Sequence, residues 1–232
     1  MGRSAKTRWR GRIAAALLLL VIIAGAWAWW VALDWRPSRE EFPLQGVLLG
    51  AEDGPLDANA LRSLGAEFVY LEASHGGAGR DARFAASLEA LQGGTLPHGV
   101  VHAYDPCIPA DRQAANFVTI VPRDAGQLPP AITLDKLASS CGDAVTEASL
   151  ESELTTFINQ VENHMGQPVV LKIEPEFEAQ YGIGARVERN LWLSRDFLQP
   201  DYAGRPWALW TANSHLRDGL TGTSLRWVVV QP

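Results

Sequence analysis

The chain has 232 residues, of which 47% are hydrophobic, and a formal net charge of −6 at pH 7. This length supports one substantial hydrophobic core, and the sequence contains neither a low-complexity run nor a repeat of about 20 to 50 residues. Residues 1–33 hold five bases and no acid, so the remainder carries 15 bases against 26 acids. A domain this acidic lacks the basic surface that nucleic acid requires, which excludes nucleic-acid binding.

The first long apolar stretch, residues 13–33, contains 21 uncharged positions. A helix rises about 1.5 Å per residue, so this stretch spans the ~30 Å hydrocarbon layer of a bilayer. Because all five bases lie in residues 1–12, the positive-inside rule predicts a cytoplasmic tail, a single-pass inner-membrane anchor and a periplasmic remainder. A cleavable signal peptide is the alternative, since Ala24-Gly25-Ala26 resembles a cleavage site, and its removal would give a secreted domain. The apolar run continues seven residues past Ala26, which favours the anchor.

Residues 34–44 combine two prolines with several charges and predict a short linker. The remaining residues, 45–232, are then expected to form one domain.

Within that domain, short apolar runs rich in β-branched residues alternate with stretches of helical spacing. The predicted strands are residues 45–49, 67–73, 99–104, 131–135 and 168–174. The predicted helices are residues 57–64, 81–92, 112–121 and 149–165. This succession implies parallel strands with helices outside. The last third predicts strands 190–193, 206–210 and 225–230 with few helices, which suggests antiparallel pairs closing an α/β, TIM-like barrel of eight strands.

The strand after Pro129-Pro130 organises the candidate site. A double proline cannot sit inside a central strand, so it starts the segment Ala131–Asp135. Thr133 and Asp135 are two residues apart and share one face of that strand. At the carboxyl end of a barrel strand both side chains would point into the pocket where such folds carry their chemistry.

The two cysteines, Cys107 and Cys141, each follow a predicted strand. In an exported domain an even cysteine count favours a disulfide, here between the loops after the third and fourth strands. Two free buried thiols are the alternative. No CxxC motif is present and no histidine lies close in sequence, so the pair predicts no metal site.

Several short blocks carry a resemblance to a known family. They are Gly46-Val47-Leu48, Gly54-Pro55-Leu56-Asp57, Phe68 to Gly76, Val101-His102, Val121-Pro122, Leu128-Pro129-Pro130, and the tryptophans Trp207 and Trp210. In this order, and with the two cysteines, they resemble the family-25 glycoside hydrolases, the lysozyme-like muramidases of bacteria and phages. The resemblance runs from about Gln45 to Gln231. It implies an irregular eight-stranded barrel, a peptidoglycan groove at its carboxyl face and cleavage after N-acetylmuramic acid.

The chain departs from this family at the acids. The resemblance implies an Asp at Leu48, an Asp-x-Glu pair where the chain has Thr133-Leu134-Asp135, and a late Asp aligned with Leu225. Glycoside cleavage needs one carboxylic acid to protonate the leaving oxygen and a second carboxylate about 5 to 9.5 Å away. Thr133 cannot carry charge, and Asp135 reaches about 1.5 Å less far than Glu, where an error of about 1 Å can cost ~100-fold.

Other residues offer substitutes for the missing acids. Glu72 and Glu174 end predicted strands, so either can form a carboxylate pair with Asp135; the alternative is that each pairs with a base. The predicted groove residues besides Asp135 are Glu72, His75, His102, Tyr104, Thr133, Glu174 and Trp210. A histidine satisfied by a hydroxyl in the core is commoner than a ligand, so no metal and no cofactor are predicted.

Three functions are consistent with the sequence. The favoured one is a membrane-tethered, degenerate muramidase-family module that binds peptidoglycan without cleaving it. The second is an active hydrolase that uses Asp135 with Glu72 or Glu174. The third is a structural or interaction domain without a glycan ligand.

Overall fold

The computed structural model describes residues 3–125, 127–142, 145–217 and 224–232. It contains two compact units that meet between Trp35 and Arg36. The first unit is helix α1 (Arg3–Ala32). Residues Trp9–Ala32 of this helix are long and apolar enough to cross a membrane, judged by length and composition alone.

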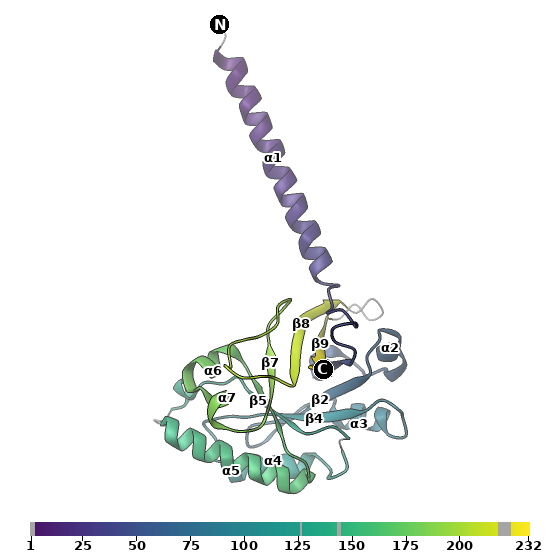
Figure 1. The fold of residues 1–232 in the computed structure, drawn as a ribbon, viewed down its shortest axis with the longest axis vertical. Helices are drawn as coiled ribbons and strands as arrows, with labels where there is room; N and C mark the ends of the chain where they lie inside the picture. Colours follow the sequence, from purple (N-terminus) through teal and green to yellow (C-terminus); the bar gives the residue numbers. More distant parts are fainter. Residues whose placement is uncertain (1–2, 126, 143–144, 218–223) are drawn as a thin grey trace. The chain divides into compact units, whose positions relative to one another are not determined.

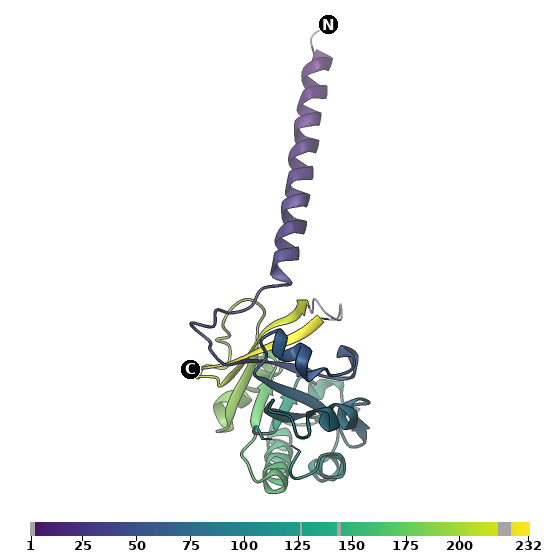
Figure 2. The same ribbon diagram turned by 90° about the vertical axis from the view of Figure 1, so that its right-hand side faces the viewer.

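The second unit is built on a closed barrel (Figures 1 and 2). Its eight strands are β1 (Gln45–Leu49), β2 (Phe68–His75), β4 (His98–Ala103), β5 (Ala131–Leu134), β6 (Val170–Ile173), β7 (Asn190–Ser194), β8 (Leu209–Arg217) and β9 (Ser224–Val230). The strands follow the order β1-β9-β8-β7-β6-β5-β4-β2, and β2 pairs back onto β1. A short strand β3 (Gly79–Arg80) extends β2. The predicted eight-stranded, TIM-like barrel is confirmed.

The strand directions differ in part from the expectation for the last third. Strands β6, β7 and β8 pair in parallel, and β9 runs antiparallel to both β8 and β1. The expected antiparallel closure is confirmed for β8–β9 and β9–β1, whereas the strand at residues 190–193 pairs in parallel with both of its neighbours. Residues 195–208 are long enough for the crossover of a dozen or more residues that parallel neighbours need, although they form no helix.

Helices surround the barrel (Figure 1). They are α2 (Ala58–Ser63), α3 (Phe84–Leu91), α4 (Ala110–Ile120), α5 (Glu147–Met165), α6 (Pro175–Tyr181) and α7 (Ile183–Arg186), with the 3₁₀ turns η1 (Ala51–Asp53) and η2 (Ala138–Ser140). The first four lie within a few residues of their predicted positions. Helix α5 illustrates the local reasons: Thr146 caps its start, and Gly166 ends it in the left-handed conformation.

The barrel interior is apolar away from its mouth. The residues that fill it are Leu48, Phe68, Tyr70, Val101, Ala131, Val170, Trp192, Leu209 and Val228. Trp192 is fully buried, and its Nε1 donates to Thr211 Oγ1 at 2.8 Å, so the one polar atom of this indole is satisfied. Outward-pointing side chains of β4 pack beneath the helices, whereas Trp210 of β8 and Trp227 of β9 pack against Phe42 and Arg36.

The segment 36–44, which we call the strap, packs on the barrel where the sequence predicted a linker. Phe42 is 3% exposed and lies against Trp207 and Trp210, with ring centroids 6.1 and 5.6 Å away. The Arg36 guanidinium lies over the Trp227 ring. Gln45, just after the strap, donates to Pro37 O and Phe42 O and accepts from Trp227 Nε1. Prolines and charges alone did not reveal these contacts.

Replacing Phe42 tests whether the strap is part of the fold. We expect Phe42→Ala to lower the free energy of unfolding of Arg36–Pro232 by about 3 kcal/mol, because it opens a cavity under the strap. Leu44→Ala is the matched control, since Leu44 is 42% exposed and its loss should cost less than about 1 kcal/mol. Urea denaturation measures both. Equal effects of the two variants would mean that the strap is not docked.

Candidate functional site

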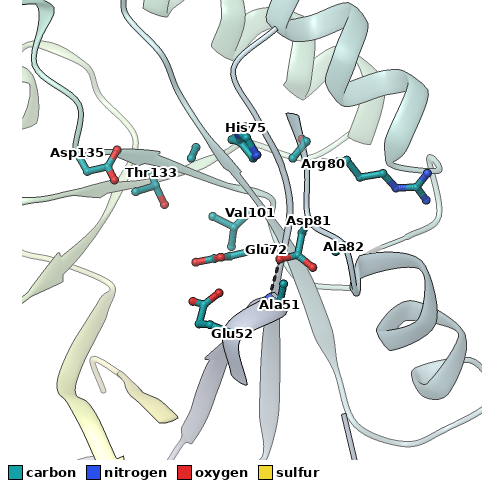
Figure 3. Close-up of a pocket in the computed structure, with 12 residues that line it drawn as sticks. Ala51, Glu52, Glu72, His75, Arg80, Asp81, Ala82, Val101, Thr133 and Asp135 are labelled. Atoms are coloured by element: carbon teal, nitrogen blue, oxygen red, sulfur yellow. Dashed lines mark hydrogen bonds between the residues drawn. The ribbon is translucent and has the colours of Figure 1, made fainter. Parts of the chain in front are cut away.

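A cavity of about 470 Å³ opens at the carboxyl end of the barrel strands (Figure 3). Residues from β2, β3, β4, β5 and the loop after β1 line it: Ala51, Glu52, Glu72, Ser74, His75, Arg80, Asp81, Ala82, Val101, Ala103, Thr133 and Asp135. This is the end of the barrel where the sequence placed the site. Four of the predicted groove residues, Glu72, His75, Thr133 and Asp135, lie together here.

Thr133 and Asp135 reach the cavity from one strand, as their spacing predicts. Thr133 belongs to β5, and Asp135 follows its last residue. Asp135 is exposed, and within the described part of the chain it has no ion pair or side-chain hydrogen bond. The pair therefore offers one hydroxyl and one carboxylate to a ligand.

The other main carboxylate of the cavity, Glu72, is held by an arginine from β9. Arg226 donates to Glu72 Oε1 and to Asp53 Oδ2, the latter at 2.7 Å, and lies 3.0 Å from Glu52 Oε1. Burial raises the pKa of Glu72, and the charge and hydrogen bonds of Arg226 oppose that rise. The sequence left two alternatives for Glu72, a carboxylate pair with Asp135 or an ion pair with a base. The structure shows the ion pair, with Arg226.

The register of β9 shows which of its residues faces the barrel mouth. Arg226 is the partner of Leu48 across the antiparallel β1–β9 pair, so both side chains lie on the same face. Leu48 belongs to the barrel interior. The residue that faces the mouth from β9 is therefore Arg226. The predicted counterpart, Leu225, is one residue away and lies on the opposite face, 3% exposed.

Glu174 is neutralised in the same way. It follows β6, and its Oε1 accepts from Lys172 Nζ and from Ser194 Oγ, the latter at 3.0 Å. Lys172 is 8% exposed. Glu174 is not among the residues that line the cavity with Asp135. Asp135 and Glu174 nevertheless follow neighbouring strands in register, since Leu134 pairs with Ile173, so what separates their roles is the ion pair that Glu174 makes with Lys172.

His102 and Tyr104 were predicted to line the groove, and the structure contradicts this. His102 in β4 and Tyr104 just after it project into the layer between barrel and helices, where each ring packs against Phe157. His102 is fully buried; Ser74 Oγ lies 2.8 Å from its Nδ1, and Gln113 Oε1 lies 3.4 Å from its Nε2. Side chains alternate along a strand, so the neighbours Val101 and Ala103 face the cavity instead.

Burial sets the ionisation of this histidine. Desolvation lowers the pKa of His102 to about 4, so the ring is neutral at pH 7. Desolvation likewise raises the pKa of the Tyr104 hydroxyl. These residues support the fold beneath the cavity.

Trp210 was also predicted for the groove and lies elsewhere. It is 2% exposed, packs against Phe42 and Trp207 under the strap, and donates from Nε1 to Arg195 O at 2.8 Å. The residues on either side of it in β8, Leu209 and Thr211, face the barrel interior instead. The sequence could not separate these two faces, because the indole suits a core as well as a glycan.

The cysteines form the predicted disulfide. Cys107 and Cys141 are bonded, with Cα atoms 5.2 Å apart. The bond joins the loop after β4 to the segment after β5, so it holds two loops on the rim from which Asp135 projects.

Among the described residues, one acidic group is compact enough to suggest a metal. Oxygens of Glu52, Glu72 and Asp81 lie within 4.8 Å of one another. Arg226 occupies the first two, and Asp81 accepts from the amide nitrogens of Ala51 and Arg83. Oxygens of all three acids therefore already have partners within the protein.

The fold and this site define an irregular TIM-like barrel with an acidic cavity at its carboxyl mouth. The sequence assigns the chain more narrowly: it belongs to the glycosyl hydrolases family 25, whose family model matches residues 51–218. Among curated proteins, none matches the sequence.

Solved structures share the fold. A family 25 glycosyl hydrolase from Bacillus anthracis is 20% identical with a TM-score of 0.76, over 86% of this chain and 93% of that one. A bacterial lysozyme from Streptomyces coelicolor is 18% identical with a TM-score of 0.71, over 82% and 92%. The catalytic domain of an endolysin from Listeria bacteriophage P40 is 15% identical with a TM-score of 0.66, over 81% and 92%.

Arg226→Met tests the role of the ion-pair cluster. Its loss leaves Asp53 and Glu72 without their cation, and we expect the free energy of unfolding to fall by about 2 kcal/mol at pH 8. The pKa of Glu72 then rises further, because the causes that lowered it are gone. A carboxyl group whose pKa is higher in the folded than in the unfolded chain destabilises the fold when it is ionised. This destabilisation is complete above the folded-state pKa and disappears below the unfolded-state pKa. The loss should therefore be smaller at pH 5.

Urea denaturation of Arg36–Pro232 at both pH values measures this difference. Arg80→Met is the matched control, since Arg80 is an exposed arginine on the same cavity and should cost less than about 0.5 kcal/mol. Adding Glu72→Gln to Arg226→Met should restore part of the loss. A loss that does not depend on pH would contradict the pairing.

His102 makes the stability of the fold depend on pH in the opposite direction, because its destabilising effect grows as the pH falls. Its folded pKa of about 4 lies below the unfolded value of 6.5, so the unfolded chain binds the extra proton first and stability falls as pH drops from 6.5 toward 4. At ~1.4 kcal/mol per pH unit, the loss between pH 7.5 and pH 5 is roughly 2 kcal/mol. His102→Gln should remove this slope in urea denaturation. An imidazole NMR signal that shows His102 protonated at pH 6 in the wild type would contradict the burial argument.

Proposed function

We propose that this chain is a membrane-tethered, lysozyme-like module outside the cytoplasm that binds peptidoglycan without cleaving it. Family membership supports a cell-wall glycan as the ligand, since similar structures are named lysozyme, muramidase and endolysin. The apolar helix Trp9–Ala32 supports the tether. An exported domain also agrees with the disulfide Cys107–Cys141.

The state of the cavity carboxylates carries the binding part of the proposal. Cleavage needs a proton donor and a second carboxylate at a set distance, both free to act on the sugar. Glu52 and Glu72 are bound to Arg226, and Asp81 is bound to backbone amides. Asp135 is the remaining cavity acid within the described residues, and its strand neighbour is Thr133. One free carboxylate cannot fill both roles.

The same cavity retains groups that suit sugar hydroxyls. Asp135 accepts hydrogen bonds, and Thr133 donates and accepts them. At about 470 Å³ the cavity is within the size range of small-ligand sites, which fits one or two sugar rings. These features support recognition of a glycan.

One observation favours an active hydrolase as the second candidate. Glu72 and Asp135 line the same cavity, and burial raises the pKa of Glu72, as a proton donor requires. Arg226 opposes this role, because it favours the ionised form of Glu72. The two candidates differ in whether Asp135 and Glu72 support turnover.

Peptidoglycan assays on Arg36–Pro232, which is a compact unit with its own closed barrel, distinguish these functions. We expect the protein to sediment with isolated sacculi and to leave their turbidity unchanged over hours. Asp135→Asn and Thr133→Val should each reduce the bound fraction about 5- to 10-fold, which corresponds to losing a hydrogen bond to a charged or polar group. Leu198→Ala, at a 59% exposed residue outside the cavity, is the control and should bind normally.

Clearing of the suspension that Asp135→Asn and Glu72→Gln both abolish would establish the hydrolase instead. Absence of both binding and clearing would leave an interaction domain without a glycan ligand.

A further inference from the structure

The strap limits how far the barrel can move from the end of its anchor. If residues 34–44 were a free linker, 11 residues would span up to about 36 to 40 Å. In the structure the chain is fixed to the barrel from Arg36 onward. Arg36 lies 4.6 Å from the centroid of the Trp227 ring and donates to Leu64 O.

Further contacts hold the strap along its length. Arg39 binds Glu67 and the carbonyls of Gly65 and Pro43. Pro37 and Phe42 are buried, and Gln45 bonds to the carbonyls of both. The strap is thus held by the guanidinium groups of Arg36 and Arg39, the buried ring of Phe42 and the hydrogen-bonded side-chain amide of Gln45. It is therefore part of the folded unit.

Little chain is left on the anchor side. Helix α1 ends at Ala32, and Leu33, Asp34 and Trp35 continue its last turn through backbone bonds to Trp29, Val31 and Ala32. From Ala32 to Arg36 there are four Cα-to-Cα steps, which cover at most about 14 Å when extended. This bound follows from the covalent chain and holds for any orientation of the two units.

The size of the barrel unit then sets the reach of the cavity. A compact unit of residues 36–232 has a radius of gyration of roughly 16 Å and a diameter of roughly 40 Å. With a tether of about 14 Å, no point of it lies more than about 55 Å from the end of α1. A ligand must therefore enter this narrow zone above the membrane.

We infer that the ligand of this module is a glycan strand still attached to a lipid of the same membrane, in preference to the cross-linked wall. The inference rests on the proposed function, which supplies both the tether and the glycan. A lipid-attached strand always begins at the bilayer surface, so tether and ligand share one thin layer and the effective concentration is high. Wall strands enter the layer only where they approach the membrane.

The test uses the full chain in phospholipid vesicles. The probe is a photoreactive lipid-linked muropeptide in the same vesicles, and the readout is the fraction of protein crosslinked. A flexible 20-residue Gly/Ser segment inserted between Asp34 and Trp35 adds about 25 Å of mean reach without touching the strap. The same segment inserted between Gly2 and Arg3 is the matched control, because it lengthens the chain on the far side of α1.

We expect the insertion after Asp34 to lower the crosslinked fraction about 3- to 10-fold and to increase the capture of vesicles by added sacculi. The control insertion should change neither quantity. In detergent micelles, the wild-type protein and the two insertion variants should bind a soluble muropeptide equally well.

Two outcomes overturn the inference separately from the proposed function. If micelle binding is present but the insertion changes neither crosslinking nor sacculus capture, the module does not select membrane-attached glycan and only this inference fails. If the wild-type protein binds no muropeptide in micelles, the proposed function fails and the inference fails with it.

Discussion

The chemistry of the barrel mouth depends on the cation that β9 places inside it. Arg226 faces the interior because it is the register partner of Leu48. A guanidinium that is 22% exposed must be compensated, and Asp53, Glu72 and Glu52 provide this. The same contacts hold the loop after β1 against the mouth. One arginine thereby draws three carboxylates into a single ion-pair cluster.

Strand alternation decides which side chains reach a ligand. Thr133 and Asp135 face the cavity from β5, while His102 and Tyr104 face the helices from β4. A register shift between Glu72 and Ser74 changes the pattern in β2. Glu72 lies before the shift, the Ser74 hydroxyl then bonds to His102, and His75 returns to the cavity side. The extra residue in β2 thus leaves Glu72 facing the cavity, while Ser74 turns toward its hydrogen bond with His102.

The strap joins helix α1 to this architecture. Strands β8 and β9 are joined to their neighbours without a covering helix, and Phe42 and Arg36 cover the tryptophans of their outer face. The strap buries aromatic surface and at the same time shortens the chain that is left between α1 and the barrel unit.

The sequence by itself determined the elements whose signal is local. The apolar run 13–33, the β, α alternation, the four longer helices, the disulfide partners and the shared face of Thr133 and Asp135 all follow from spacing and residue type. Blocks of sequence in order were enough to indicate the family.

Only the tertiary structure decided which residues meet. Arg226 lies 154 positions from Glu72 in the chain, and no local pattern pairs them. The docking of residues 36–44, the outward position of Trp210 and the parallel direction of β8 likewise depend on register and on surfaces far away in sequence. An indole, an arginine or a proline suits several environments, and only the closure of the barrel selects one of them.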